Sequence, residues 1–266
     1  MTPLRNLSGA HQYSQYNIIV NHVDISGFDI QYNHPHDLAA IIECYVMDVY
    51  HTKNIREGDI VLDLGAGIGE FSILASRKVG ASGKVISIES SPDDYVTLLN
   101  NVKNNNCSNV YAVNLAVGDC DQTIELEFKG KKFEARCRKV EEILQDVHTN
   151  KVNFVKMDIE GAEIYVIPSN ESIIAGAKYL SIEMHKRYHE TLIPYLEHKG
   201  FLFHRVTRGD YIKNAAKFFF AHPVMSIKLL ADLRRANEFP GAKKILSGVE
   251  IASSNDLVDG TFSKVL

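Results

Sequence analysis

The second half of the chain places acidic side chains and one histidine where they could accept protons. Asp158 and Glu160 follow one hydrophobic run, and Glu183 and His185 end another. A carboxylate or an imidazole within hydrogen-bond reach can take the proton of a hydroxyl group, which speeds reaction at that oxygen by roughly 10²–10⁴-fold. We predict that Asp158 or Glu160 is a general base. Glu183 and His185 are second candidates, and an unperturbed histidine titrates near neutral pH.

The same residue types raise the question of a metal site. Asp158 and Glu160 are paired carboxylates, which suit Mg²⁺, but the sequence shows no third ligand beside them. His34 and His36 flank a proline just before a predicted helix, where histidines are usually ordinary surface residues. We therefore predict no metal site.

Residues 59–70 could bind a nucleotide. They read D-I-V-L-D-L-G-A-G-I-G-E, in which Gly65, Gly67 and Gly69 follow an apolar run at alternate positions. Glycine permits unusual turn dihedrals and lets a ligand approach the backbone closely. A dinucleotide-binding G-x-G-x-x-G sequence would place its third glycine where Glu70 stands, so the spacing argues against NAD. A tight turn in another kind of α/β protein is the alternative.

Strands and helices must position these residues. Residues 60–64 form an apolar run typical of a strand buried on both faces of a parallel sheet, and residues 71–79 repeat apolar side chains with helical spacing. A second buried strand, 84–88, ends at Glu89. This acid lies 24 positions after Gly65 (89 − 65). That is close to the offset of about 20 expected for a carboxylate that binds a ribose.

The rest of the chain continues this alternation of strands and helices. Further strands are predicted at 110–115, 152–157, 178–184, 201–206 and 217–221. The pattern predicts an α/β fold with a mostly parallel seven-stranded sheet, an antiparallel last strand and helices on both faces. We expect three segments: an N-terminal β-hairpin extension at 1–36, the main domain at 37–222 and a C-terminal helical extension at 223–266.

The composition narrows the class of protein. The 266 residues carry a net charge of −4, which gives no global electrostatic argument for binding nucleic acid. The cysteines lack a C-x-x-C pair, which indicates free thiols in a reducing compartment. No apolar run approaches ~18 residues, and the N-terminus does not resemble a signal peptide. We predict a cytoplasmic protein without a membrane partner. The four cysteines are Cys44, Cys107, Cys120 and Cys137.

Basic residues form one cluster, directly after a predicted strand at 123–128. The simpler interpretation is a solvated hairpin, and the alternative is a contact surface for an anionic substrate. The members of this basic cluster are Lys129, Lys131, Lys132, Arg136, Arg138 and Lys139.

The chain resembles the FkbM family of S-adenosylmethionine (SAM)-dependent methyltransferases, roughly over residues 35–205. D-I-E-G-A-E is the most specific element, because class I methyltransferases in general do not share it. The family often has Asn where Gly67 stands and Pro where Ser90 stands. The resemblance rests on D-L-G-A-G-I-G-E-F at 63–71, V-I-S-I-E at 85–89, N-L-A-V-G-D at 114–119, F-V-K-M-D-I-E-G-A-E at 154–163 and L-S-I-E-M-H at 180–185.

The resemblance implies a Rossmann-like class I methyltransferase fold, SAM as methyl donor and usually an oxygen of a small molecule or sugar as acceptor. It implies that Asp63 orients the glycine turn or the donor's ammonium group, and that Glu89 binds the ribose. Glu163 is expected at a helix N-terminus or behind the reacting groups. The expected cofactor-binding residues are Asp63, Gly65, Ala66, Gly67, Gly69, Glu89, Ser90, Asn114, Ala116 and Asp158, and the expected catalytic residues are Asp158, Glu160 and His185.

Other functions are compatible with the same sequence. An RNA methyltransferase would use the basic cluster as its contact surface. A non-catalytic SAM- or nucleotide-binding protein would use Asp158 and Glu160 only to cap the following helix. We favour a small-molecule or glycan acceptor over nucleic acid, and a homo-oligomer is compatible with the sequence.

Overall fold

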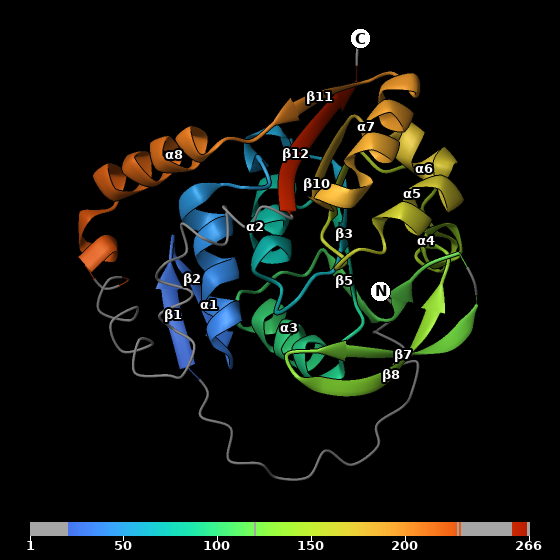
Figure 1. Ribbon diagram of the computed structural model, residues 1–266. Helices are drawn as coiled ribbons and strands as arrows, with labels where there is room; N and C mark the ends of the chain where they lie inside the picture. The colour runs from blue at the N-terminus through green and yellow to red at the C-terminus, as the bar shows by residue number, and fades with distance from the viewer. Residues whose placement is uncertain (1–20, 120, 228, 230–256, 265–266) are drawn as a thin grey trace.

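A seven-stranded sheet forms the centre of the fold, and helices cover both of its faces (Figure 1). The computed structural model describes residues 21–119, 121–227, 229 and 257–264. The strand order across the sheet is β11-β12-β10-β9-β3-β4-β5. These strands are β3 (Ile60–Leu64), β4 (Lys84–Glu89), β5 (Val110–Asn114), β9 (Phe154–Met157), β10 (Tyr179–His185), β11 (Phe201–Arg205) and β12 (Leu257–Lys264).

Five strands run parallel in the order β10-β9-β3-β4-β5, and β12 pairs antiparallel with both β10 and β11. This confirms the predicted α/β class with its mostly parallel sheet and antiparallel last strand. The first strand of the sheet in the sequence, β3, lies near the middle, where the direction of strand addition reverses. In open α/β sheets, ligands bind beyond the carboxyl ends of the strands at such a point.

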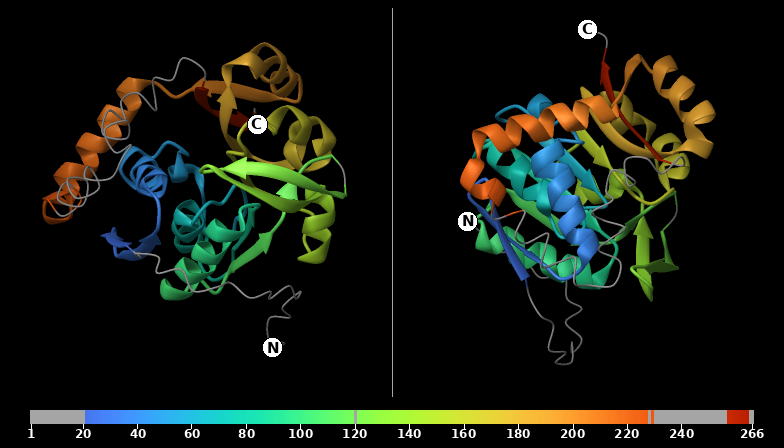
Figure 2. Two further views of the ribbon diagram at one scale, coloured as in Figure 1. Left: turned by 60° about the horizontal axis from the view of Figure 1, so that its bottom comes forward. Right: turned by 60° about the vertical axis from the view of Figure 1, so that its left-hand side comes forward.

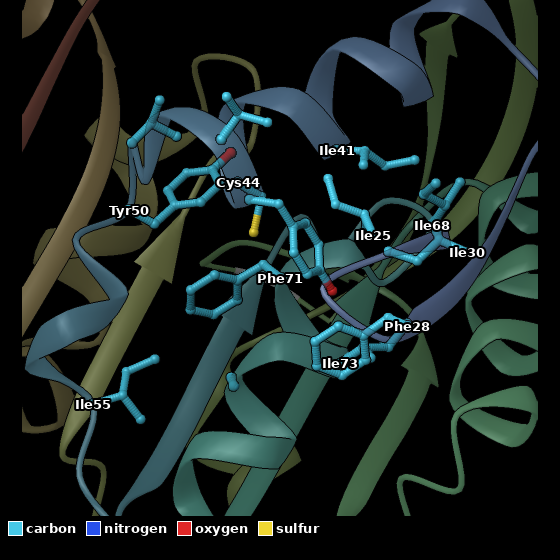
Figure 3. Close-up of a cluster of buried hydrophobic side chains, with 14 of the residues drawn as sticks. Ile25, Phe28, Ile30, Ile41, Cys44, Tyr50, Ile55, Ile68, Phe71 and Ile73 are labelled. Carbon is cyan, nitrogen blue, oxygen red and sulfur yellow. The ribbon is translucent and has the colours of Figure 1, made fainter. Parts of the chain in front are cut away.

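One face of the sheet packs against helices from the first half of the chain. α1 (Pro35–Ile42), a π-helical turn at Glu43–Met47 and α2 (Glu70–Val79) contribute to a cluster of buried side chains with the hairpin of β1 (Asn21–Ile25) and β2 (Phe28–Tyr32). Figure 3 shows part of this cluster, in which the ring of Tyr50 lies 5.4 Å from that of Phe71. The hairpin therefore belongs to the core, as its alternating buried residues require.

Helices from the second half of the chain cover the other face. Strand side chains alternate between the two faces, so Val61 packs with the first cluster whereas Leu62 and Leu64 pack with the second. α3 contacts β2, α2 and β5 instead. The helices of the second face are α4 (Val140–Asp146), α5 (Glu163–Ser169), α6 (Glu171–Gly176) and α7 (His189–His198), and α3 spans Pro92–Asn104.

The predicted strand at 217–221 is wrong, because these residues end the helix α8 (Arg208–Ala221). Thr207 caps this helix and Asp210 completes a capping box, a signal that outweighs the β-prone run of phenylalanines. α8 lies over α1 and the π-helical turn (Figure 2), and the side-chain amide of Asn214 donates to the carbonyl of Met47 at 2.8 Å.

The antiparallel strand comes instead from β12, inside the segment that we expected to be a helical extension. This strand lies between β10 and β11 and is paired on both sides over residues 260–263. Residues 223–227 are helical, as expected, and the remainder of the helix expected there lies outside the described residues. The predicted boundary at residue 36 falls within α1, which begins at Pro35.

The described residues contain no helix that is both long and apolar enough to cross a membrane. Cys44, Cys107 and Cys137 are buried, and Cys120 lies outside the described residues.

The basic cluster lies mainly on β8 (Lys131–Arg138), which forms a hairpin with β7 (Gln122–Phe128). β8 also pairs with β6 (Ala116–Val117). Acidic side chains of this same chain bind five of its six basic residues. The pairs are Lys129 with Asp37 and Asp94, Lys131 with Asp93, Lys132 with Glu125, Arg136 with Asp121, and Arg138 with Glu142 and Asp146.

Lys129 fixes the tip of this hairpin to the main body. Its ammonium group lies 2.5 Å from Asp37 on α1 and 2.7 Å from Asp94 on α3, and all three side chains are largely buried. The two carboxylates raise the pKa of Lys129 although burial opposes its charge. Removing one partner of a buried ion pair leaves an uncompensated charge, which is more costly than losing an exposed pair.

We expect Lys129→Met to lower the free energy of unfolding by roughly 3–5 kcal/mol, because it leaves the buried Asp37 and Asp94 without their cation. Lys132→Met is the matched control, since Lys132 and Glu125 are both about two-thirds exposed. It should change stability by no more than about 1 kcal/mol. Urea unfolding of both variants measures the free energy of unfolding. Equal decreases in the two variants would show that the buried ion pairs of Lys129 contribute no more than an exposed pair.

Candidate functional site

The glycine turn connects β3 to α2 and is tied to its neighbours through backbone groups. The amides of Gly65 and Ala66 both donate to the carbonyl of Ile88 at 3.0 Å, and the side chain of Asn101 donates to the carbonyl of Ile68 at 2.9 Å. The turn therefore lies at the carboxyl ends of β3 and β4, as its sequence predicted. Gly69 precedes the first residue of α2.

Gly65 is required by the neighbouring strand as well as by the turn. Its φ is +74°, and a Cβ there would lie 1.8 Å from the carbonyl oxygen of Asp158. At Gly67, by contrast, a Cβ would meet only one oxygen of Glu70, at 3.7 Å. The end of β9 is thus in direct contact with the glycine turn, and the open backbone face is at Gly67.

Lys156 is the buried centre of the site, and our prediction from sequence did not include it. Its side chain is 1% exposed, and its Nζ donates to the carbonyl of Gly65 at 2.5 Å. The same ammonium group lies 3.5 Å from Asp63 and 3.8 Å from Asp158. Burial opposes its charge, but the surrounding carboxylates outweigh that effect and raise the pKa of Lys156. The available signal was a lysine inside a strand that is otherwise apolar.

Asp63 and Glu70 are two buried acids beside Lys156. Asp63 accepts from the hydroxyl of Ser72 at 2.5 Å through one oxygen, and its other oxygen lies 3.5 Å from the ammonium group of Lys156. One oxygen of Glu70 is buried without a donor among the described residues. Burial raises the pKa of both acids, that of Glu70 to about 8. A cationic ligand group would satisfy such oxygens, and SAM carries an ammonium and a sulfonium. The residues fit this cofactor.

Glu89 lies at the end of β4 and joins the glycine turn to α3. Its two carboxylate oxygens accept from the amides of Gly67 at 2.8 Å and Ser91 at 2.6 Å. The side chain of Asn114 donates to the carbonyls of Glu89 and Ser90. Burial raises the pKa of Glu89 to about 7. The structure therefore brings the predicted Glu89, Ser90 and Asn114 together, with Ala116 directly beyond them in β6.

The first two candidate bases follow β9 but differ in their surroundings. Asp158 accepts a hydrogen bond from the hydroxyl of Tyr50 at 2.9 Å, and its side chain is 26% exposed. Glu160 is exposed and has a left-handed backbone, with φ of +55°. Neighbouring protein atoms still remove part of the water around its carboxyl group, and this desolvation together with the charge of Asp158 raises the pKa of Glu160. Tyr50, which precedes β3, was not identifiable from sequence because only the fold brings it here.

Glu163 and His185 lie behind this loop. Glu163 begins α5, as predicted, and is fully buried. His185 ends β10, and a Cβ at Gly161 would lie 3.7 Å from its ring. Within the described part of the chain, no group of three or more His, Cys, Asp or Glu side chains is arranged to hold a metal ion.

We expect Gly65→Ala to lower the free energy of unfolding by roughly 2–5 kcal/mol, from left-handed backbone strain and from overlap with the carbonyl of Asp158. Gly130→Ala is the matched control, because Gly130 has a φ of +73° and nothing within 4 Å of its missing Cβ. It should cost only the backbone strain, about 1–2 kcal/mol. Denaturant unfolding measures both, and equal costs would show that the contact with Asp158 is unimportant.

The stability of the ligand-free protein should fall as pH rises from about 4.5 to about 8. Glu70 ionises near its ordinary value of 4.5 when unfolded but near 8 when folded, so over this range the folded state retains a proton that the unfolded state has lost. Glu70→Gln, which resembles the protonated acid, should reduce this decline. Denaturation midpoints between pH 4.5 and 8.5 test it.

Glu171→Gln is the control for this pH series. Glu171 is exposed, and its hydrogen bond from Lys199 lowers its pKa, so the decline should persist in that variant. A decline of equal size in Glu70→Gln would refute the assignment to Glu70.

Comparisons with known proteins give matches that cover different shares of the chain. The family model described as "Methyltransferase FkbM domain" matches residues 63–203, which is more than half of the chain. A 23S rRNA (uracil(1939)-C(5))-methyltransferase of Acinetobacter baumannii is 32% identical over 90 residues, 32% of this chain and 20% of that protein. Protein-L-isoaspartate O-methyltransferase 2 of Archaeoglobus fulgidus is 44% identical over 59 residues, 22% of this chain and 23% of that protein. The chain thus spans less than a quarter of either relative.

Solved structures give weaker likenesses. Fibrillarin of Aeropyrum pernix has a TM-score of 0.46 and 14% identity, over 74% of this chain and 80% of that chain. The TYW2 protein of M. jannaschii has a TM-score of 0.45 and 15% identity, over 96% of this chain and 90% of that chain. The family match rests instead on the segments that build the site, from Asp63 in β3 through Lys156 and Glu163 to β11. By that match the chain belongs to the FkbM methyltransferase family and is a SAM-dependent methyltransferase.

Proposed function

We propose that this methyltransferase transfers the methyl group to an oxygen of a small molecule or sugar. The observation that carries the proposal is the contact between the glycine turn and the loop after β9, where the carbonyl of Asp158 fills the space beside Gly65. Because of this contact, Asp158 lies next to the turn that the family uses for its donor. Glu160 belongs to the same loop, and His185 adjoins that loop at Gly161.

The chain's own residues have three tasks in such a reaction. Bound SAM supplies an electrophilic methyl group on a sulfonium. Gly67 and Glu89 hold the adenosine side of the donor, and Asp63 and Glu70 offer negative charge to its cationic groups. An alcohol is a poor nucleophile until its proton leaves, so a carboxylate after β9 or the imidazole of His185 must take that proton. Most of the remaining barrier is lowered by holding oxygen, carbon and sulfur in line.

The basic cluster bears on the RNA alternative. The match to an rRNA methyltransferase favours RNA as acceptor, but five of the six basic side chains are already paired with acids of this chain. An RNA phosphate would have to displace those carboxylates. A methyl transfer to RNA with affinity that falls steeply as salt rises would favour this alternative.

We expect Glu89→Gln to weaken SAM binding by roughly 10–100-fold, because hydrogen bonds to a charged group contribute about 1.5–3 kcal/mol. Isothermal titration with SAM and with S-adenosylhomocysteine measures this in the purified protein. Asp93→Asn is the control, since this acid lies at the N-terminal end of α3, which Glu89 also contacts, but its side chain is 58% exposed and pairs with Lys131. Unchanged affinity in Glu89→Gln would remove Glu89 from the donor site.

The acceptor class is tested with methyl-labelled SAM and pairs of acceptors that differ only in one group. Each pair presents a hydroxyl and an amino group on the same small-molecule or sugar scaffold. Label should enter the hydroxyl compound of at least one pair. Transfer confined to the amines, or to RNA, would overturn the proposed oxygen acceptor while leaving SAM binding intact.

A further inference from the structure

We infer that Glu163 and His185 form a Glu–His dyad. Glu163 orients the imidazole, and Nε2 of His185 takes the proton of the acceptor hydroxyl. The inference rests on the proposed function, because it names the proton acceptor of that same site. His185 is then the catalytic residue and Glu163 its positioning residue.

One oxygen of Glu163 and one nitrogen of His185 face each other. Oε2 of Glu163 lies 4.0 Å from Nδ1 of His185, and both atoms are buried without a hydrogen-bond partner among the described residues. An approach of about 1 Å would make a hydrogen bond. Catalytic hydrogen bonds are often long before substrate binds and tighten in the complex.

Glu163 is held rigidly for this role. Its other oxygen, Oε1, accepts from the amides of Ile159 and Gly161, each at 3.3 Å, and the residue is fully buried. Burial raises the pKa of Glu163, whereas these backbone donors and the nearby His185 oppose the rise. A carboxylate removed from water stabilises a neighbouring positive charge more strongly than an exposed one does.

The pairing also fixes which ring nitrogen of His185 can accept a proton. A carboxylate beside Nδ1 favours the tautomer with a proton on Nδ1, so Nε2 carries a free lone pair. The side chain of His185 is 25% exposed, so part of it is accessible to an acceptor molecule.

The ring adjoins the loop that contacts the glycine turn. His185 packs against Gly161, three positions after Asp158, whose carbonyl lies beside Gly65. The described titratable and charged groups around the ring are Glu163, Glu160, Arg187 beside Gly161, Tyr188 with its ring 6.3 Å away, and Glu183 on the same face of β10.

The proposed step balances without another reactant. The acceptor oxygen bonds to the methyl carbon, the carbon–sulfur bond breaks and its electron pair stays on sulfur, which leaves S-adenosylhomocysteine. His185 takes the hydroxyl proton at Nε2, and Glu163 stabilises the resulting imidazolium through its proton on Nδ1. Release of the Nε2 proton to water restores the neutral ring with its remaining proton on Nδ1.

The first test needs neither SAM nor an acceptor. Glu163→Gln keeps an amide oxygen for Ile159 and Gly161, so the loop should stay folded, but it removes the charge and points an NH₂ group at Nδ1. In protein labelled with ¹⁵N-histidine, the ring nitrogen signals of His185, assigned with His185→Gln, should show the neutral ring with its proton on Nδ1, and in Glu163→Gln with its proton on Nε2. Glu160→Gln, which removes a charge from the same loop, should keep the proton on Nδ1. An unchanged tautomer in Glu163→Gln would refute the pair.

The second test separates the pair from the proposed function. Both Glu163→Gln and His185→Gln should bind SAM within about threefold of the unsubstituted protein, but transfer methyl to the alcohol found in the screen more slowly by 10²-fold or more. The acid limb of the remaining activity of Glu163→Gln should move to lower pH. Failure of the unsubstituted protein to bind SAM would refute the proposed function and would leave the tautomer result standing. Normal turnover in His185→Gln, with turnover lost in Glu160→Gln, would overturn the role of His185.

Discussion

The ammonium group of Lys156 is the interaction on which the site depends. It joins the end of β3, through the carbonyl of Gly65, to the end of β9, through Asp158. Burying one cation is expensive unless carboxylates and a carbonyl surround it, and burying those carboxylates is equally expensive without the cation. The ends of β3 and β9 must therefore lie beside each other, so that the lysine and the carboxylates compensate one another. This explains why the glycine turn and the D-I-E-G loop are in direct contact.

One lysine does not balance the acids around it. Asp63, Glu70 and Glu89 are all buried near Lys156, and burial raises the pKa of each, to about 8 for Glu70 and about 7 for Glu89. Without a ligand, Glu70 and Glu89 reduce the free-energy cost of their burial by retaining protons near neutral pH. A donor that carries positive charge lets them ionise. The same imbalance that weakens the ligand-free protein at higher pH thus favours a sulfonium cofactor, which links the burial of these side chains to the chemistry of the family.

Short sequence patterns predicted those parts of the site that are formed by residues close together in the chain. The glycine turn and the acid at the end of β4 follow from short apolar runs and turn residues, and the structure has them where expected. Lys156 and Tyr50 were not predicted, because their roles arise from contacts between segments far apart in the chain. β12 was missed for a related reason, since its place between β10 and β11 depends on pairing across a long separation. At 217–221, a run of three phenylalanines suggested a strand, although the capping residues ten positions earlier define a helix.

The charges of the β7–β8 hairpin are a second case in which contacts between distant segments could not be predicted from sequence. A sequence counts basic residues but does not show which acids they meet, and here Asp37, Asp93 and Asp94 reach the hairpin from α1 and α3. Those ion pairs use the positive charge to hold the hairpin against the main body, so little of it is left to attract a polyanion. Under the function proposed above, the acceptor is selected at the ends of β9 and β10, beside the groups proposed to take its proton. Selection there would depend on the shape and hydroxyl groups of a small molecule more than on long-range charge.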